Sequence, residues 1–138
     1  MNDRRVPPEG VESVPWNPFS RHCASRGLLD AIGDKWSILI VVTLADGELR
    51  YGQIEKAVDG ISQKMLSQRL HSLVDDGLVT RTAHQEIPPK VVYGLTDLGQ
   101  SAVPVLRGLV DWTVEHMSRV QDHREGSGVV DLGETTVG

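Results

Sequence analysis

The stretch GISQKMLSQRL, residues 60–70, begins like a helix whose first residues are specified one by one. Ser62 is typical of an N-cap, because its side chain can accept a hydrogen bond from a free amide of the first turn. Ile61 and Leu66 have the spacing of a hydrophobic staple, which fixes the angle at which the chain enters the helix. At about 100° per residue, the apolar side chains form one stripe, which consists of Leu66, Leu70, Leu73 and Val74. The pattern predicts a helix over residues 62–76.

The opposite face of this predicted helix carries amides, hydroxyls and bases but no glutamate. Amides and hydroxyls both donate and accept hydrogen bonds, which suits the edges of DNA bases, and lysine suits guanine or phosphate. In helices that enter the major groove of DNA, the residues that contact bases cluster in the N-terminal half. The candidate base-reading residues are Gln63, Lys64, Ser67, Gln68 and His71. From this helix alone, the solvated face of an ordinary helix remains an equal alternative.

Further helices are predicted on both sides of this segment. They cover residues 21–32, 35–45, 51–58 and 97 to about 119, with Ser20, Asp34 and Thr96 as caps of the first, second and last. The helix over 51–58 is expected to bury Tyr51, Ile54 and Val58. Pro104 lies inside the last helix, where it removes one hydrogen bond and is expected to kink the helix.

A change of period after Gly77 predicts two strands. They cover residues 78–85 and 91–95, and Pro88-Pro89 marks the tip of the hairpin between them. A very short extended piece is expected at 49–50. Two helices joined by a tight turn and followed by a hairpin describe a winged helix-turn-helix. The predicted fold class is therefore α+β, mainly helical, with a two-stranded wing.

The composition predicts one soluble domain. The chain has 138 residues, 39% of them hydrophobic, and its net charge is −5. No apolar run approaches the roughly 20 residues that span a bilayer, and we expect a cytoplasmic protein. The acid excess lies at the two ends, so a local basic face in the middle remains open. We predict a flexible arm over 1–18, the folded domain over 19–119 and a disordered tail over 120–138.

The chain resembles the HxlR family of bacterial winged-helix regulators. The resemblance rests on IGDKW (32–36), LADGELRYGQI (44–54), GISQKMLSQRL (60–70), DGLVTR (76–81), PPKVVYGLTDLG (88–99) and Trp112, in the order and spacing of the family. It extends from Cys23 to Trp112, about two thirds of the chain. Each piece is weak alone, but together they are specific.

Three positions depart from the usual pattern of the family. Two glycines usually precede Lys-Trp, where this chain has Gly33-Asp34. Phenylalanine is usual where Tyr51 lies, and proline often follows the cysteine, where Ala24 follows Cys23. We expect none of these departures to touch the helix-turn-helix core.

The resemblance implies a homodimeric transcription factor that binds an operator and whose first and last helices form the dimer. The last helix also carries more apolar surface than one side of a small domain needs. The candidate interface residues are Leu28, Leu106, Leu109, Val110, Trp112 and Met117. Packing within the domain is the alternative for the same side chains.

Several residues beside the base-reading face are candidates for the DNA backbone or for the wing contact. They are Lys35, Arg50, Ser62, Arg69, Arg81, His84 and Lys90. Arg69 would reach a phosphate or pair with an acid such as Asp75 or Glu55. Arg50 would meet a phosphate or pair with Glu48 or Glu55, and for Lys35 a solvated surface position is an equal alternative. Glu86 at the tip of the wing would repel phosphate, so the expected contribution of the wing is modest.

Cys23 is the one cysteine of the chain, which excludes an internal disulfide. It is predicted in the first turn of its helix beside basic residues, a setting that favours a reactive thiol. In some relatives a cysteine at this position senses oxidants or electrophiles, so Cys23 is a candidate redox switch; a buried, inert cysteine is the alternative. The sequence shows no metal-spaced cluster and no catalytic motif, and we expect neither a cofactor nor enzyme activity.

Together these observations predict a sequence-specific regulator that binds double-stranded DNA. The expected protein is a repressor that acts as a homodimer on a palindromic operator and responds to an oxidant, an electrophile or a small ligand. Two alternatives remain open: a winged helix used as a protein-interaction module, and a metal-responsive regulator of the ArsR-like kind. An interaction surface would carry exposed aromatic or methionine side chains where this helix has amides and hydroxyls.

Overall fold

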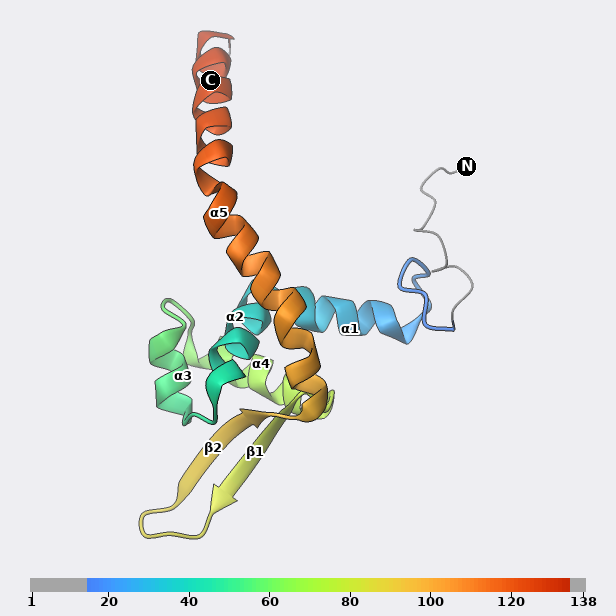
Figure 1. Cartoon of the computed structure of the whole chain (residues 1–138), viewed down its shortest axis with the longest axis vertical. Coiled ribbons are helices and arrows are strands. Elements are labelled where there is room, and N and C mark those ends of the chain that lie inside the picture. Colours follow the sequence, from blue (N-terminus) through green and yellow to red (C-terminus); the bar gives the residue numbers. More distant parts are fainter. Residues whose placement is uncertain (1–14, 135–138) are drawn as a thin grey trace. The chain divides into compact units, whose positions relative to one another are not determined.

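The computed structural model of the chain describes the backbone of residues 15–134 and the side chains of residues 15–126. Its elements are α1 (Ala24–Gly33), α2 (Lys35–Thr43), the 3-10 turn η1 (Leu44–Asp46), α3 (Tyr51–Ala57), α4 (Gln63–Asp75), β1 (Val79–His84), β2 (Lys90–Leu95) and α5 (Asp97–Glu134), as Figure 1 shows. The chain divides into two units, one that ends at Val103 and one that begins at Pro104, and each is described by itself. None of the helices in the described part is long and apolar enough to cross a membrane.

Helices α1 to α4 enclose the core of the first unit. Helix α2 packs against α1, α3 and α4, and α4 also packs against α1 and β1. The fully buried apolar side chains come from each of the central elements: Ile40, Val41, Leu44, Ile54, Leu66, Leu70, Leu73 and Val79. The predicted stripe of α4 is confirmed, because Leu66, Leu70 and Leu73 are buried and Val74 is half-buried.

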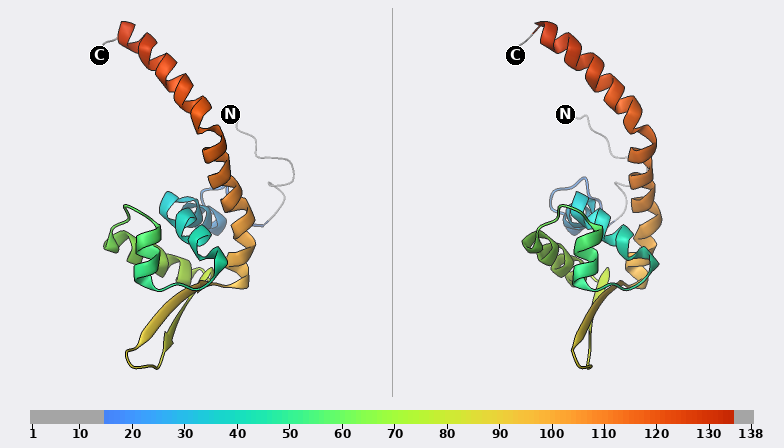
Figure 2. Two further views of the ribbon diagram at one scale, coloured as in Figure 1. Left: turned by 60° about the vertical axis from the view of Figure 1, so that its left-hand side comes forward. Right: turned by 90° about the vertical axis from the view of Figure 1, so that its left-hand side faces the viewer.

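The hairpin that follows α4 is antiparallel, with a register that runs from Val79 opposite Leu95 to His84 opposite Lys90. The predicted extended piece at 49–50 is confirmed as a bridge, in which Leu49 exchanges backbone hydrogen bonds of 2.9 and 2.8 Å with Tyr93. This bridge joins the segment before α3 to the base of the hairpin. The hairpin projects away from helices α2 to α4 in both views of Figure 2, as a wing does. The predicted winged helix-turn-helix is therefore confirmed.

Two helix boundaries differ from the prediction by three residues or more, whereas α2 and α3 end only two residues and one residue early, at Thr43 and Ala57. Helix α1 begins at Ala24 rather than at residue 21, because a turn precedes it: the amide of Cys23 donates to the Ser20 carbonyl over 3.1 Å, and Ser20 Oγ accepts from the His22 amide. Cys23 is thus the N-cap of α1 and not part of its first turn. Helix α5 continues to Glu134, beyond the predicted end near residue 119. Gln121, Arg124 and Glu125 are helix-forming residues that favour the first turns of this extension, and Gln121 donates a side-chain hydrogen bond of 3.1 Å to Glu125 one turn later.

The start of α5 is confirmed in detail. The hydroxyl of Thr96 accepts from the Gly99 amide over 3.0 Å and donates to the Gly77 carbonyl over 2.7 Å. Gly99 itself lies so close to the residue before β1 that a Cβ atom there would collide with the carbonyl oxygen of Leu78. The cap and the close approach together hold the first turn of α5 against the end of α4 and the start of the wing.

Candidate nucleic-acid interface

The start of α4 is fixed as its sequence predicts. Ser62 is the N-cap, and its Oγ accepts from the Met65 amide over 3.0 Å. Ile61 and Leu66, the predicted staple, are both buried. The polar side chains that follow are all exposed on one side of the first two turns: Gln63, Lys64, Ser67 and Gln68. The second helix of the helix-turn-helix therefore presents donors, acceptors and one cation at its N-terminal end.

Tyr51 connects α3 to this face of α4. Its hydroxyl lies 2.8 Å from the carbonyl oxygen of Gln63 and 3.0 Å from Oγ of Ser67. The sequence pattern predicts a buried Tyr51, but the residue is half-buried and its hydroxyl reaches the exposed side of α4. The signal for this contact was the hydroxyl itself, at a position where the family usually has phenylalanine.

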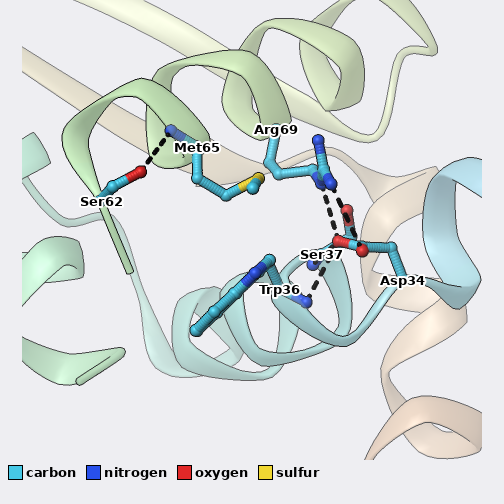
Figure 3. Close-up of polar contacts among 6 residues, drawn as sticks. All are labelled: Asp34, Trp36, Ser37, Ser62, Met65 and Arg69. Atoms are coloured by element: carbon cyan, nitrogen blue, oxygen red, sulfur yellow. Dashed lines mark hydrogen bonds and ion pairs between the residues drawn. The ribbon is translucent and has the colours of Figure 1, made fainter. Parts of the chain in front are cut away.

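Asp34 connects the start of α2 to the centre of α4. Figure 3 shows its carboxylate between the α2 backbone and the guanidinium of Arg69. It accepts from the amides of Trp36 and Ser37 over 3.1 and 3.2 Å, which confirms it as the predicted cap of α2. It also accepts from Arg69 Nε over 2.7 Å and from Nη2 over 3.4 Å. Both side chains of this ion pair are 28% exposed.

This pairing corrects the expectation for Arg69. The sequence predicts that Arg69 reaches a phosphate or pairs with an acid such as Asp75 or Glu55, whereas its partner is Asp34, the N-cap of α2. Arg69 projects from the edge of the apolar stripe, toward α2 rather than toward the exposed amides. Its role in this structure is to tie α4 to α2, so we do not count it among the phosphate contacts.

The ion pair shifts the pKa of both of its members. The Arg69 guanidinium lowers the pKa of the Asp34 carboxyl below its ordinary value of 3.8. The amides of Ser37 and Trp36 act in the same direction, and partial burial opposes them. Asp34 in turn raises the pKa of the Arg69 guanidinium. Asp34 is therefore charged at neutral pH, as both of its structural roles require.

The expectation that the family departures lie away from the helix-turn-helix core is wrong. Asp34 and Tyr51 are two of those departures, and both make hydrogen bonds to α4. Each bond joins residues on different helices, so spacing along the sequence did not reveal it. The contacts of these two side chains with α4 are what the sequence did not predict.

A hollow of about 450 Å³ brings together two of the predicted backbone contacts. Arg50, at the N-cap of α3, and Lys90, the first residue of β2, both line it. Gln53 and Glu48 line it as well, and Gln53 accepts from the Arg50 amide over 2.8 Å. The two cations Arg50 and Lys90 outnumber the one carboxylate, Glu48, so the hollow has a net positive charge, which suits a phosphate group.

A smaller hollow of about 200 Å³ lies between α4 and the wing. Ser67 and His71 of α4 line it together with Arg81 of β1, so it contains members of both predicted contact sets. His71 is exposed, and its Nε2 lies 3.2 Å from Oδ2 of Asp75 one turn along the helix. The wing therefore adds a cation beside the exposed face of α4.

The other predicted contacts lie apart from these two hollows. His84 is exposed and is opposite Lys90 in the register, near the tip of the wing. The ammonium of Lys35 lies over the ring of Trp36, 4.4 Å from its centroid. A lysine in this position has a partner within the protein, which matches the alternative of an ordinary surface residue.

The predicted dimer residues are distributed over both units. Leu28 on α1 is 43% exposed, and in the second unit Leu109, Trp112 and Met117 are 42–53% exposed. Val110 is half-buried, and Leu106 is only 6% exposed in the single chain, so little of it remains for a partner. Trp112 stacks on His116 with their ring centroids 4.7 Å apart.

Cys23 is a free, half-buried thiol at the N-cap of α1. Its Sγ lies 3.1 Å from Oγ of Ser25, whose own hydroxyl donates to the Trp16 carbonyl over 2.9 Å. With that proton of Ser25 used, the thiol has two acceptors in reach, Oγ of Ser25 and, at 3.9 Å, the Pro15 carbonyl. Within the described part of the chain, no three His, Cys, Asp or Glu side chains gather as a metal site requires.

A helix-turn-helix with a polar, exposed second helix and a two-stranded wing defines a winged helix-turn-helix transcriptional regulator. The family model for the HxlR-like helix-turn-helix matches residues 31–121, and the chain belongs to this family. The resemblance seen in the sequence is thereby confirmed.

Individual relatives agree with this assignment. An uncharacterized HTH-type transcriptional regulator of Methanothermobacter thermautotrophicus is 38% identical over 106 residues, which cover 77% of this chain and 78% of the relative. The solved structure of the transcriptional regulator ytfH from Salmonella typhimurium has a TM-score of 0.73 at 36% identity and covers 78% of this chain and 96% of its own. The redox regulator HypR in its oxidized form has a TM-score of 0.63 at 32% identity and covers 67% of this chain and 96% of its own.

Proposed function

We propose that this regulator is a homodimeric repressor that places α4 in the major groove of a palindromic operator. The observation that carries the proposal is the exposed polar face of α4, held at a defined angle by the Ser62 cap. Its amide, hydroxyl and ammonium groups match the donor and acceptor pattern of base edges. In this proposal Gln63, Lys64, Ser67 and Gln68 read bases, and His71 lies at the end of that set.

The proposed phosphate contacts flank this face. Arg50 and Lys90 share one hollow, and Arg81 lies beside Ser67 in the other. His84 would follow the backbone at the wing, whereas Lys35 and Arg69 already have partners within the protein. So few cations give one subunit weak affinity, because phosphate contacts supply most of the nonspecific binding free energy.

The proposed homodimer compensates for this weakness. Two subunits double the phosphate contacts and place two α4 helices about one helical turn of DNA apart. Exposed apolar side chains on α1 and α5 support this assembly, because surfaces of this kind are typical of subunit contacts. A symmetric dimer requires a palindromic operator. Repression is the proposed outcome, since a dimer seated within a promoter excludes the polymerase.

We also propose an oxidant or electrophile as the effector, with Cys23 as the residue that it modifies. The support is a free thiol at the start of α1 and the similarity to a redox regulator. The test compares wild type with Cys23→Ser in operator binding before and after a mild oxidant. Equal release of DNA by both proteins would remove this part of the proposal.

Fluorescence anisotropy with DNA fragments from upstream of the gene, at two salt concentrations, tests the DNA-binding proposal. We expect a salt-sensitive complex that Lys64→Ala and Gln68→Ala weaken. Lys56→Ala is the matched control, because Lys56 is exposed on α3 and lies outside the proposed contact set. Absence of a salt-sensitive complex with every upstream fragment would contradict the proposal.

A further inference from the structure

The hydroxyl of Tyr51 makes two short contacts that can be satisfied in one way. The carbonyl oxygen of Gln63 lies 2.8 Å from it, and Oγ of Ser67 lies 3.0 Å from it. A carbonyl oxygen can only accept, so the single phenolic proton must fill the contact to Gln63. With that proton used, the Tyr51 oxygen can only accept from Ser67, and the Ser67 hydroxyl donates its proton to Tyr51.

The reverse arrangement is unfavourable. If the phenolic proton pointed at Ser67, two sets of lone pairs would face each other across the 2.8 Å contact with the Gln63 carbonyl. The carbonyl belongs to the first turn of α4, and Tyr51 is the first residue of α3. The Gln63 carbonyl is part of the α4 backbone and cannot turn away without moving the helix, so the direction of the phenolic proton is the part that adapts.

This arrangement restricts what Ser67 can offer to a ligand. A free serine hydroxyl can donate or accept, so it reads base edges of either kind. Ser67 is exposed on the proposed base-reading face, but its proton is held by Tyr51. What remains toward solvent is its oxygen lone pairs, which only accept hydrogen bonds.

We propose that Tyr51 is a specificity-determining residue that makes Ser67 an acceptor-only reader of the major groove. The base opposite Ser67 must then supply a donor, which in the major groove is the amino group of adenine or cytosine. The keto oxygens of guanine and thymine at that place meet lone pairs and are rejected. This inference rests on the proposed insertion of α4 into the major groove, and it adds which chemical group one position of the operator carries.

The test is a base-preference profile of the operator, measured by systematic substitution of each base pair. For the wild type we expect one position in each half-site at which adenine or cytosine is bound about 5- to 150-fold more tightly than guanine or thymine. This is the discrimination that a good base contact provides. In Ser67→Ala this preference disappears at that position alone. In Tyr51→Phe the ring remains, but the Ser67 hydroxyl is free to donate its proton to the DNA. Guanine and thymine are then tolerated at that position, while the base preferences at the other positions stay the same.

The double variant Tyr51→Phe/Ser67→Ala provides the internal control, because it should have the profile of Ser67→Ala. If Tyr51 is only structural, Tyr51→Phe lowers affinity equally for all bases and leaves the profile intact, which overturns the inference. An unchanged profile in Ser67→Ala overturns it as well. If the wild type forms no specific complex with any DNA, the proposed function itself fails. Thermal unfolding of each variant shows whether the folded state is retained.

Discussion

Asp34 has two roles at the level of single atoms. Its carboxylate caps α2 and also holds Arg69 of α4. We expect Asp34→Ser to lower the free energy of unfolding by about 1–2 kcal/mol, because serine can keep the cap but loses the partly buried ion pair with Arg69 and its two hydrogen bonds. Urea unfolding of Asp34→Ser, Arg69→Gln and the double variant measures the coupling. Additive losses would show that the two side chains do not stabilise each other.

The same pair predicts how stability depends on pH. The pKa of Asp34 is lower in the folded protein than its ordinary value of 3.8, so the folded state binds this proton less readily than the unfolded chain does. The contribution of Asp34 is therefore fully present above about pH 5 and is lost as the pH falls through 3.8 toward the lowered value. The measurement is the difference in unfolding free energy between wild type and Asp34→Asn across this range. A difference that stays constant down to pH 2 would contradict the assignment.

Gly99 supplies a third prediction at this scale. A methyl group there would collide with the Leu78 carbonyl oxygen, which belongs to the backbone and cannot move aside alone. We expect Gly99→Ala to cost about 1–3 kcal/mol of stability, as overpacking does. Gly108→Ala is the control on the same helix, because nothing lies within 4 Å of its Cβ position. That control should gain up to about 1 kcal/mol from helix propensity. A neutral Gly99→Ala would show that the backbone adapts at no cost.

At the scale of elements, the sequence predicts a structure best where the signals are local. The cap, staple and stripe of α4 lie within fifteen positions of one another; the structure confirms the cap and the stripe and buries both residues of the predicted staple. The start of α1 was misplaced because Ser20 forms a turn of its own, and hydroxyl residues serve turns and caps equally well. The end of α5 was misplaced because its polar, glycine-containing final stretch resembles a disordered tail.

Contacts between elements were harder to predict, as Tyr51 and Arg69 show. Both contacts join residues of different structural elements, 16 and 35 positions apart in the sequence. Spacing shows that Arg69 lies at the edge of a stripe, but it cannot choose among the acids that the fold brings near. Likewise, spacing shows that Tyr51 begins a helix, but it does not show that the hydroxyl extends beyond the core to contact α4. The exposed polar face of α4 could be predicted, whereas the side chains that hold this face against α2 and α3 could be found only from the fold.

At the scale of the whole molecule, charge and assembly are coupled. The chain has a net charge of −5, so DNA binding must rest on a few local cations. For a dimer the number of phosphate contacts doubles, and each contact lowers log K by about 0.9 per decade of salt. The salt dependence of binding therefore reports how many subunits engage the operator.

We expect Leu109→Asp to weaken the proposed dimer, because Leu109 is 50% exposed on α5 and a carboxylate resists burial against a second copy. The variant should elute as a smaller species in size-exclusion chromatography, and its salt slope on a half-site should be about half that of the wild type on the full operator. Ser118→Asp is the matched control, since it is exposed on the same helix and, at about 100° per residue, lies on roughly the opposite side. If Leu109→Asp keeps the salt slope and the elution volume of the wild type, the dimer contact lies elsewhere. If Leu109→Asp and Ser118→Asp reduce the salt slope and the apparent size equally, the added charge on α5 is the cause.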